Sequence, residues 1–317
     1  MTLGLAPVDR VEILTLQDNY IDIVARDDSD VVQRARSRPG FSLERSLCAE
    51  HGFSLLVTLE RGGQRRSLLF DFGYSAEGAR RNAEALGVDL SRVEAAALSH
   101  GHFDHTGGLA DMMGRLAPTA ELVLHPAVYR GPRFTKRADG QRAPLPQFLE
   151  QQLAEAGVSP VETREPYPLL DGQAAFLGEI PRVTDFEQPS GTMCYEAADG
   201  TEHVDAFEDD TGLVIRLAGR GLVVISGCAH SGIVNTIRHA QAVAGEEPVH
   251  AVIGGFHLTG MDEATQIRPT VEALREIGPR IVVPAHCTGR NAQQAIERAL
   301  PEAFVLNMVG TALHLGG

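Results

Sequence analysis

Short apolar runs of strand type alternate with amphipathic stretches along most of this chain. Runs rich in Val, Ile and Leu predict buried strands at residues 11–16, 53–59, 67–70, 93–98, 213–217, 222–225, 249–253 and 281–283. Apolar residues at helical spacing, with glycine at several boundaries, predict helices at residues 76–86, 107–116, 145–157, 232–243, 262–277 and 289–300. This alternation of strands and helices predicts an α/β protein.

Two segments interrupt the alternation. Residues 126–146 contain four prolines, and residues 181–211 mix Pro, Gly, Asp and Glu without a period. Both are interpreted as surface insertions. Because no linker separates the two halves of the chain, residues 1–317 are predicted to form a single domain with insertions near 126–146 and 181–211.

The densest group of reactive side chains follows the predicted strand at residues 93–98. His100, His102, Asp104 and His105 stand within six residues of one another. Alternation lets His100 and His102 point the same way from an extended turn, whereas Asp104 and His105 fall where the chain turns into a helix. Imidazole and carboxylate donors together suit Zn, Mn or Fe, and helix packing explains none of the four. The spacing predicts a centre of two divalent transition metals, most favourably Zn.

The predicted strands of the second half are followed by further candidate donors: Cys228, His230, His257 and His286. In an α/β fold, loops at the same end of successive strands meet at one edge of the sheet, so these side chains are expected to converge. In the first half, Asp71 follows a predicted strand. It is either a turn residue or a carboxylate that orients a histidine ligand.

Composition excludes several classes of function. The 317 residues include 28 Lys and Arg against 42 Asp and Glu, and the formal net charge of −14 argues against a nucleic-acid surface. No run approaches the ~20 apolar residues of a membrane span, and the first twenty residues are too charged for a signal peptide. Four scattered cysteines indicate reduced thiols. We therefore expect a cytoplasmic protein with a small-molecule substrate and no membrane or nucleic-acid partner.

The motifs resemble those of the metallo-β-lactamase-fold hydrolases. The matching segments are Phe70-Asp71-Phe72-Gly73, the His-x-His-x-Asp-His motif from His100 to His105 with the following Thr106-Gly107-Gly108, and Pro284-Ala285-His286. The resemblance implies two β-sheets packed face to face with helices outside, which is a four-layer αββα sandwich. It also implies a two-metal site at the edge of the sheets.

Within this superfamily the chain looks most like the branch that includes the dihydropterin-ribofuranosylaminobenzene phosphate synthases. The shared segments are Asp18-Asn19, Glu50-His51-Gly52-Phe53-Ser54, Ser99-His100-Gly101-His102, Gly227-Cys228-Ala229-His230-Ser231-Gly232, Gly254-Gly255-Phe256-His257-Leu258 and Ala285-His286-Cys287-Thr288-Gly289. The likeness runs from about Val11 to the C-terminal end, and it points to pterin-type ligands.

One position departs from the common hydrolase pattern. Members of that family carry a metal-bridging Asp at the strand end where this chain has Cys228, and their isolated upstream His falls here near Asp209-Asp210. A thiolate binds Zn strongly but bridges with a different geometry. Cys228, Asp71 and Asp210 are therefore either ligands or residues that support ligands. We favour His230 as the replacement ligand, with Cys228 as a small buried residue beside it.

The resulting hypothesis distributes six ligands over two metals. One set is His100, His102 and His286, and the other is Asp104, His105 and His230. Asp104 is also expected to orient the attacking water, and His257 is expected to contact the substrate or act as a general acid. Two metals lower the pKa of water bound between them to about 7, which supplies hydroxide at neutral pH.

The predicted enzyme is thus a dinuclear metal-dependent hydrolase or transferase that uses a metal-bound hydroxide on a small phosphorylated or diphosphate-bearing, pterin-like molecule. Two alternatives stay open: a lactone or thioester hydrolase, and a non-catalytic metal protein that senses a ligand or serves redox chemistry. The first insertion offers basic side chains for a phosphate, although such a loop is more often only solvated. They are Arg130, Arg133, Lys136, Arg137 and Arg142.

Overall fold

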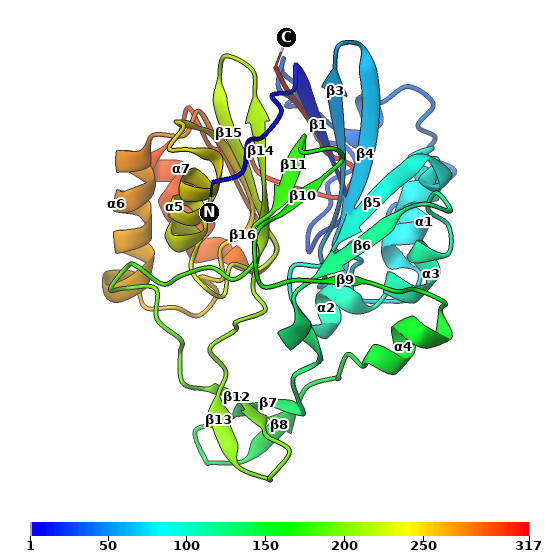
Figure 1. The fold of residues 1–317 in the computed structure, drawn as a ribbon. Coiled ribbons are helices and arrows are strands. Elements are labelled where there is room, and N and C mark those ends of the chain that lie inside the picture. The colour runs from blue at the N-terminus through cyan, green and yellow to red at the C-terminus, as the bar shows by residue number, and fades with distance from the viewer. Residues whose placement is uncertain (1, 317) are drawn as a thin grey trace.

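The computed structural model describes residues 2–316, and its strands form two large sheets and one small sheet (Figure 1). The first large sheet has the strand order β2-β18-β1-β3-β4-β5-β6-β9. The bounds of its strands are β1 Arg10–Gln17, β2 Val32–Gln33, β3 Ser54–Arg61, β4 Gln64–Phe70, β5 Val93–Ala97, β6 Glu121–Leu124, β9 Val161–Glu162 and β18 Ala312–Leu315. Strands β4, β5, β6 and β9 run parallel to one another, and the remaining pairs are antiparallel.

The second large sheet repeats this plan with the order β10-β11-β14-β15-β16-β17. Its strands are β10 Tyr167–Leu169, β11 Ala174–Phe176, β14 Gly212–Leu217, β15 Gly221–Ser226, β16 Val249–Gly255 and β17 Ile281–Ala285. An antiparallel part leads into the parallel strands β15, β16 and β17. The loops that follow these parallel strands therefore gather at one end of the sheet.

Helices cover the outer faces of both sheets (Figure 1). On the side of the first sheet lie α1 Gly78–Ala85, α2 Phe103–Thr106, α3 Leu109–Met113 and α4 Glu150–Glu155, and on the side of the second lie α5 Ile233–Ala244, α6 Arg268–Ile277 and α7 Arg290–Ala299. The inner faces of the sheets share a buried apolar cluster that includes Phe53, Phe70, Phe176, Ile225 and Ile253. Two further clusters fill the spaces beneath the helices. This succession of layers confirms the predicted four-layer αββα sandwich.

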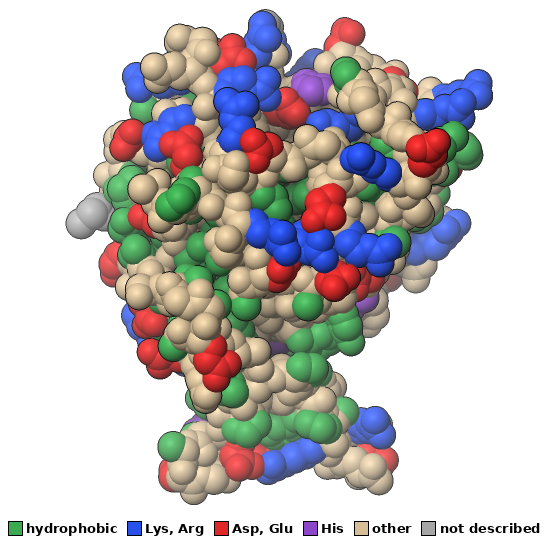
Figure 2. All heavy atoms as spheres, turned by 90° about the vertical axis from the view of Figure 1, so that its right-hand side faces the viewer, with side chains coloured by type: hydrophobic (Ala, Val, Ile, Leu, Met, Phe, Trp, Pro, Cys, Tyr) green, Lys and Arg blue, Asp and Glu red, His purple; other side chains and the backbone are tan. Residues whose placement is uncertain are grey.

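Segments from the two predicted insertions pair with each other. The strands β7 Arg133–Lys136, β8 Arg142–Pro144, β12 Met193–Glu196 and β13 Glu202–Val204 form an antiparallel sheet in the order β13-β12-β7-β8. This small sheet projects below the sandwich, and Figure 2 shows acidic and basic side chains next to one another on it. The sequence pattern does not predict this pairing, because the strands are very short and their partners lie far apart in the chain.

Two predicted helices differ from the observed ones. At residues 145–157 the helix is confined to α4, because the chain leaves Pro146 in a non-helical conformation and the side chain of Gln152 accepts a hydrogen bond from the Leu149 N–H (2.8 Å) to begin the helix there. At residues 107–116 the Gly107 N–H bonds instead to the Gly73 carbonyl (2.9 Å). None of the helices within residues 2–316 combines the length and apolar character that a membrane-spanning segment needs.

Candidate metal centre

The loop after β5 brings four donor side chains to one end of the sandwich. His100 and His105 are fully buried, and His102 and Asp104 are 7% and 6% exposed. His102 has extended backbone at the start of α2, and this helix carries Asp104 and His105. The local sequence motif is therefore folded into two pairs of donors, one before the helix and one on it.

Loops of the second sheet bring further donors to the same end. Cys228 and His230 follow β15, His257 follows β16, and His286 follows β17. The φ angles of His257 and His286 are 45° and 48°, and Ala229, between the first two donors, has φ 56°. Positive φ is uncommon outside glycine and concentrates at functional sites, where the surrounding structure holds the strained backbone in place.

The donor atoms form three groups that share the thiol of Cys228; two of them contain residues of the histidine motif, and the third consists of Cys228, His257 and Cys287. In each group the donor atoms all lie within 4.8 Å of one another; the first group is Asp104, His105, Cys228 and His286, and the second is His100, Cys228 and His230. Cys228 Sγ lies 3.3 Å from His105 Nε2. A thiol common to both groups lies where two ions could share a donor; burial raises the pKa of Cys228, so a bound metal would be needed to hold it as a thiolate.

In the structure, His230 and His286 each lie in the donor group that was predicted for the other. His286 Nε2 lies 3.1 Å from Asp104 Oδ2, so His286 joins the Asp104 group and not the group of His100 and His102. His230 Nε2 lies 3.2 Å from His100 Nε2. The predicted assignment of these two residues was wrong, because the spacing of residues in the sequence does not define which loop of the second sheet faces which half of the motif.

His102 completes the second group by its position. Its ring centroid lies 4.7 Å from that of His100 and 4.8 Å from that of His230. Its Nε2 atom is buried and has no hydrogen-bond partner among residues 2–316. A buried polar atom without a partner is costly unless something binds it. This nitrogen, together with the facing Nε2 atoms of His100 and His230, fits a divalent transition-metal ion.

The protonation states of the second group and of Asp104 also suit metal binding. Burial, reinforced by neighbouring basic groups, lowers the pKa values of His100 and His230 well below the ordinary value and lowers that of His102 to about 3. Neutral imidazoles offer a lone pair, whereas protonated ones do not. Burial alone would raise the pKa of Asp104, but His105 and His286 lower it, so the carboxylate is ionised.

Asp71 supports the first group from behind. Its carboxylate accepts hydrogen bonds from the Ser99 N–H and the Ser99 hydroxyl, both at 2.7 Å, and lies 2.6 Å from His105 Nδ1. Burial opposes protonation of His105, yet Asp71 and Asp104 raise its pKa to about 9. The Asp71 contact leaves Nε2 of His105 directed toward the donor group, which is the orienting role considered for this carboxylate.

Asp18 and Asn19 hold His286 in the same way. Asn19 Oδ1 lies 3.0 Å from His286 Nδ1, and Asn19 Nδ2 donates to the His286 carbonyl (3.0 Å). Asp18 accepts from the His286 N–H (3.0 Å). The sequence analysis noted this pair in the resemblance but assigned it no role, since nothing in its spacing connects residue 18 to residue 286. At the mouth of the site, His51 Nε2 lies 3.4 Å from Asp104 Oδ2.

Asp209 and Asp210 take different positions near the histidine loop. Asp209 accepts from the Gly101 N–H (2.9 Å) and from Arg133 Nη2 (2.7 Å), which ties the loop to the small sheet. Asp210 accepts from the Ser231 N–H (2.8 Å), and its Oδ1 is buried without a partner among the described residues. Burial raises the pKa of Asp210 to about 6. Asp210 lies outside both donor groups, so the structure gives it a supporting position.

His257 lies between the centre and a neighbouring apolar hollow. Its ring centroid is 4.0 Å from that of His230, and its Nδ1 is buried without a hydrogen-bond partner among residues 2–316. Phe207, which the sequence analysis missed, stacks on His230 with centroids 4.1 Å apart. Beyond them the hollow is lined mainly by apolar side chains: Phe186, Pro189, Met193, Phe207, Phe256, Leu258 and Met261.

Most of the basic side chains proposed for phosphate binding are ion-paired. Arg133 is buried between Asp205 and Asp209, with both contacts at 2.7 Å. Arg130 pairs with Glu208. Lys136 and Arg142 pair with acidic residues of the small sheet. These charges hold the two insertions together, and none of these side chains lines the hollow beside the metal centre.

A family model described as the metallo-beta-lactamase superfamily matches residues 50–286, a span that contains every proposed metal ligand. The chain belongs to the metallo-beta-lactamase superfamily. Membership confirms the resemblance drawn from the sequence motifs, and it agrees with the layers and the position of the donor groups.

Two proteins of Methanocaldococcus jannaschii are similar to this superfamily member over most of their lengths. One, described as a 7,8-dihydropterin-6-methyl-4-(beta-D-ribofuranosyl)-aminobenzene-5'-phosphate synthase, is 30% identical over 306 residues, which is 96% of each chain. An uncharacterized protein is 27% identical over 267 residues, covering 84% of this chain and 94% of its own. A solved metal-dependent hydrolase of the beta-lactamase superfamily has a TM-score of 0.71 and 27% identity, covering 97% of this chain and 100% of that one.

Proposed function

We propose that this superfamily member is an enzyme with two divalent transition-metal ions that acts on a small phosphorylated or diphosphate-bearing, pterin-like molecule by group transfer or hydrolysis. One observation carries the proposal: two buried donor groups meet in a chain that is 30% identical, over 96% of its length, to the dihydropterin-ribofuranosyl-aminobenzene phosphate synthase named above. Zn is the first choice because His, Asp and Cys donors all suit it, while Mn and Fe match the His and Asp donors.

The donor groups define which residues would hold each ion. One ion would be held by His100, His102 and His230, the other by Asp104, His105 and His286, with Cys228 Sγ common to both. When bound, two such ions polarise a phosphoryl or carbonyl group and lower the pKa of a water molecule to about 7.

The chain's own groups orient the reactants. Asp71 holds the ring of His105, and Asn19 holds the ring of His286, so both rings are fixed before any substrate arrives. Asp104 would accept a hydrogen bond from the incoming nucleophile and so align it. His257 borders both the donor groups and the hollow, and its unpartnered Nδ1 can donate a proton to the leaving group.

The hollow next to His257 has a volume of about 40 Å³, so it would contact the edge of an uncharged ring rather than enclose it. Its walls are mainly aromatic and aliphatic. Its polar side chains, besides His230 and His257, are Glu187, Gln188, Ser190, Gln266 and Thr270, and no Lys or Arg lines it among the described residues. Flat apolar walls with a few hydrogen-bonding groups favour a heteroaromatic ring over a phosphate. The phosphate of the substrate would therefore face the metal centre.

Group transfer is the form of the reaction that the synthase relative suggests. The name of that relative describes a product in which a 6-methyl dihydropterin is joined to an aminobenzene. Forming this bond requires a leaving group on the methyl carbon: the amine attacks that carbon, the bond to a diphosphate breaks, and the amine loses one proton. Water in place of the amine would give hydrolysis.

The test is to incubate the full-length, metal-loaded protein with a 6-hydroxymethyl-dihydropterin diphosphate, with and without a ribofuranosylaminobenzene 5'-phosphate. Mass-resolved chromatography then follows both substrates. Amine-dependent formation of the coupled compound supports transfer, and release of diphosphate without amine supports hydrolysis. Cleavage of lactones or thioesters with no turnover of either pterin mixture would contradict the proposal.

A further inference from the structure

Each parallel strand of the second sheet has a basic residue at or near its start, at the end opposite the metal centre. Arg220 precedes β15, His250 is the second residue of β16, and Arg280 precedes β17. The same three strands end in candidate metal ligands. Since they contain six, seven and five residues, at ~3.3 Å per residue the two ends lie roughly 20 Å apart.

A bulge in β16 determines where His250 points. Leu222 pairs with Val249 and Val223 pairs with Ala251, so His250 is the extra residue and has no partner on β15. Bulges redirect side chains out of the regular alternation. His250 is 8% exposed, and it lines a pocket of about 860 Å³ where β17 faces β2 and β18 across the sandwich.

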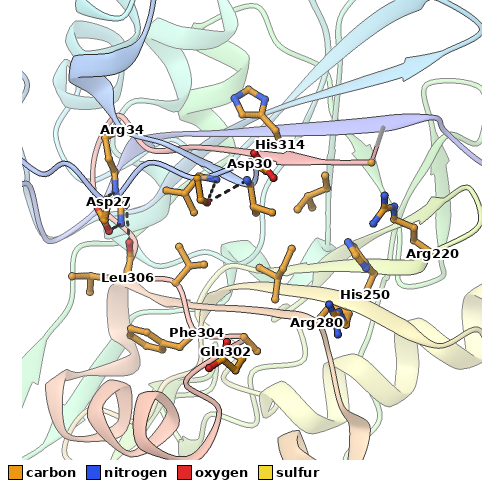
Figure 3. A pocket seen from close by; sticks show the side chains of 18 of the residues that line it. Asp27, Asp30, Arg34, Arg220, His250, Arg280, Glu302, Phe304, Leu306 and His314 are labelled. Atoms are coloured by element: carbon orange, nitrogen blue, oxygen red, sulfur yellow. Dashed lines mark hydrogen bonds and ion pairs between the residues drawn. The ribbon is translucent and has the colours of Figure 1, made fainter.

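The basic residues gather at one end of this pocket. Figure 3 shows Arg220, His250 and Arg280 one beside the next, whereas the ion pair of Asp27 and Arg34 lies at the opposite end. Arg34 Nε donates to Asp27 Oδ1 (2.8 Å), so that carboxylate is already neutralised. The pocket's three other carboxylates belong to Asp30, Glu297 and Glu302. The cluster therefore gives the pocket a positive end in a chain whose net charge is −14.

Two members of the cluster, His250 and Arg280, have unmet binding capacity. The imidazole of His250 forms no hydrogen bond within residues 2–316, and none of the carboxylates described there forms an ion pair with Arg280. Burial and the guanidinium groups of Arg220 and Arg280 lower the pKa of His250, so its imidazole is neutral near pH 7 and can still donate one hydrogen bond. An anion here would pair with the guanidinium of Arg280 and supply the missing acceptor.

We propose that this pocket is a binding site for a small phosphate-bearing anion, separate from the metal centre and held chiefly by Arg280 and His250, with Arg220 adding positive charge. A guanidinium group matches phosphate oxygens with two parallel hydrogen bonds, and the imidazole adds a third donor. Val31, Ile281 and Phe304 add apolar lining to the same pocket, which would contact the organic part of a phosphate ester.

Equilibrium dialysis of the full-length, metal-bound protein tests the site with two probes, inorganic phosphate and ribose 5-phosphate. Arg280→Gln and His250→Gln remove the proposed contacts. Arg275→Gln removes the same charge from the exposed surface of α6 and is the control. We expect a binding event that weakens about tenfold or more in each pocket variant and is unchanged in the control. Phosphate bound at the metal centre would not respond to these variants.

Binding curves that coincide for the parent, both pocket variants and the control would overturn the proposal. Tighter binding of ribose 5-phosphate than of inorganic phosphate would identify an organic ester as the ligand, whereas equal affinities would identify the free anion. Melting curves of both pocket variants check that the fold is retained, and because the two substitutions lie on different strands, either one alone keeps the test valid.

Discussion

Cys228 gives this centre a donor that differs chemically from the rest of its set. Its thiol lies within both donor groups, whereas the remaining donors of those groups are imidazoles and one carboxylate. The preference for His230 alone, drawn from the sequence, treated the thiol as a filler. The structure instead supports both residues as donors, because Sγ lies 3.3 Å from His105 Nε2 and His230 faces His100.

Cys228→Ser should therefore lower the bound metal from about two ions toward one per chain, since a hydroxyl is a much weaker zinc ligand than a thiolate. His230→Ala should also lose metal. Elemental analysis of the purified variants measures the effect. The matched control is Cys194→Ser, which alters a buried cysteine on β12 of the small sheet. Full metal retention in Cys228→Ser would show that Cys228 is a small buried residue and not a metal ligand.

Asp104 is the carboxylate on which the first group converges. Its Oδ2 lies 3.1 Å from His286 Nε2 and 3.7 Å from His105 Nε2. Asp104→Asn keeps the volume but removes the charge, so we expect a folded protein whose turnover falls by about a hundredfold or more while KM changes little. Steady-state kinetics with the pterin substrates measure both values. A rate near that of the parent would move the role to another group, and Asp210, whose buried Oδ1 has no partner among the described residues, is the first candidate.

At the scale of elements, the two insertions act as a brace for the histidine loop. Arg133 on β7 binds Asp209, and Asp209 holds the Gly101 N–H in that loop. Gly101 itself is required, because a Cβ there would lie 2.1 Å from the Val128 carbonyl oxygen. The small sheet therefore positions the metal ligands even though its strands contribute none of the donor atoms in the two groups.

Arg133→Gln should destabilise the fold, because it leaves the buried carboxylate of Asp209 without a cation and leaves that of Asp205 with only Arg130, at 3.9 Å. Removing one partner of a buried ion pair costs about 3 kcal/mol or more of unfolding free energy. Arg142→Gln is the control: its partners Glu196 and Glu202 are about one-third exposed, so its loss should lower the unfolding free energy much less. Urea unfolding distinguishes them, and equal losses would contradict the bracing role.

For the whole molecule, the layered fold and the position of the site could be predicted because their signals are local. Strand-type runs and the motif from His100 to His105 each lie in a few consecutive residues. Contacts between distant segments could not be predicted. Three such contacts depend on how loops from the two sheets meet. They are the hydrogen bond between Asn19 and His286, the stacking of Phe207 on His230, and the distribution of His230 and His286 between the donor groups.

The sandwich also separates two kinds of chemistry at opposite ends of the same strands. The ends of β15, β16 and β17 lead to donors for metal, and their beginnings carry the basic cluster at the large pocket. A strand is rigid along its length, so both sites are fixed relative to one another. The C-terminal ends of these strands therefore carry the proposed reaction centre, and their N-terminal ends carry the proposed anion site.

The central claim is that the two donor groups hold two metal ions, and elemental analysis of the purified full-length protein tests it most directly. Seven buried donors that form two groups are too many for one tetrahedral ion. We predict close to two transition-metal ions per chain, with a marked loss in His102→Ala. Fewer than one ion per chain, even after Zn, Mn or Fe has been supplied, would contradict the account.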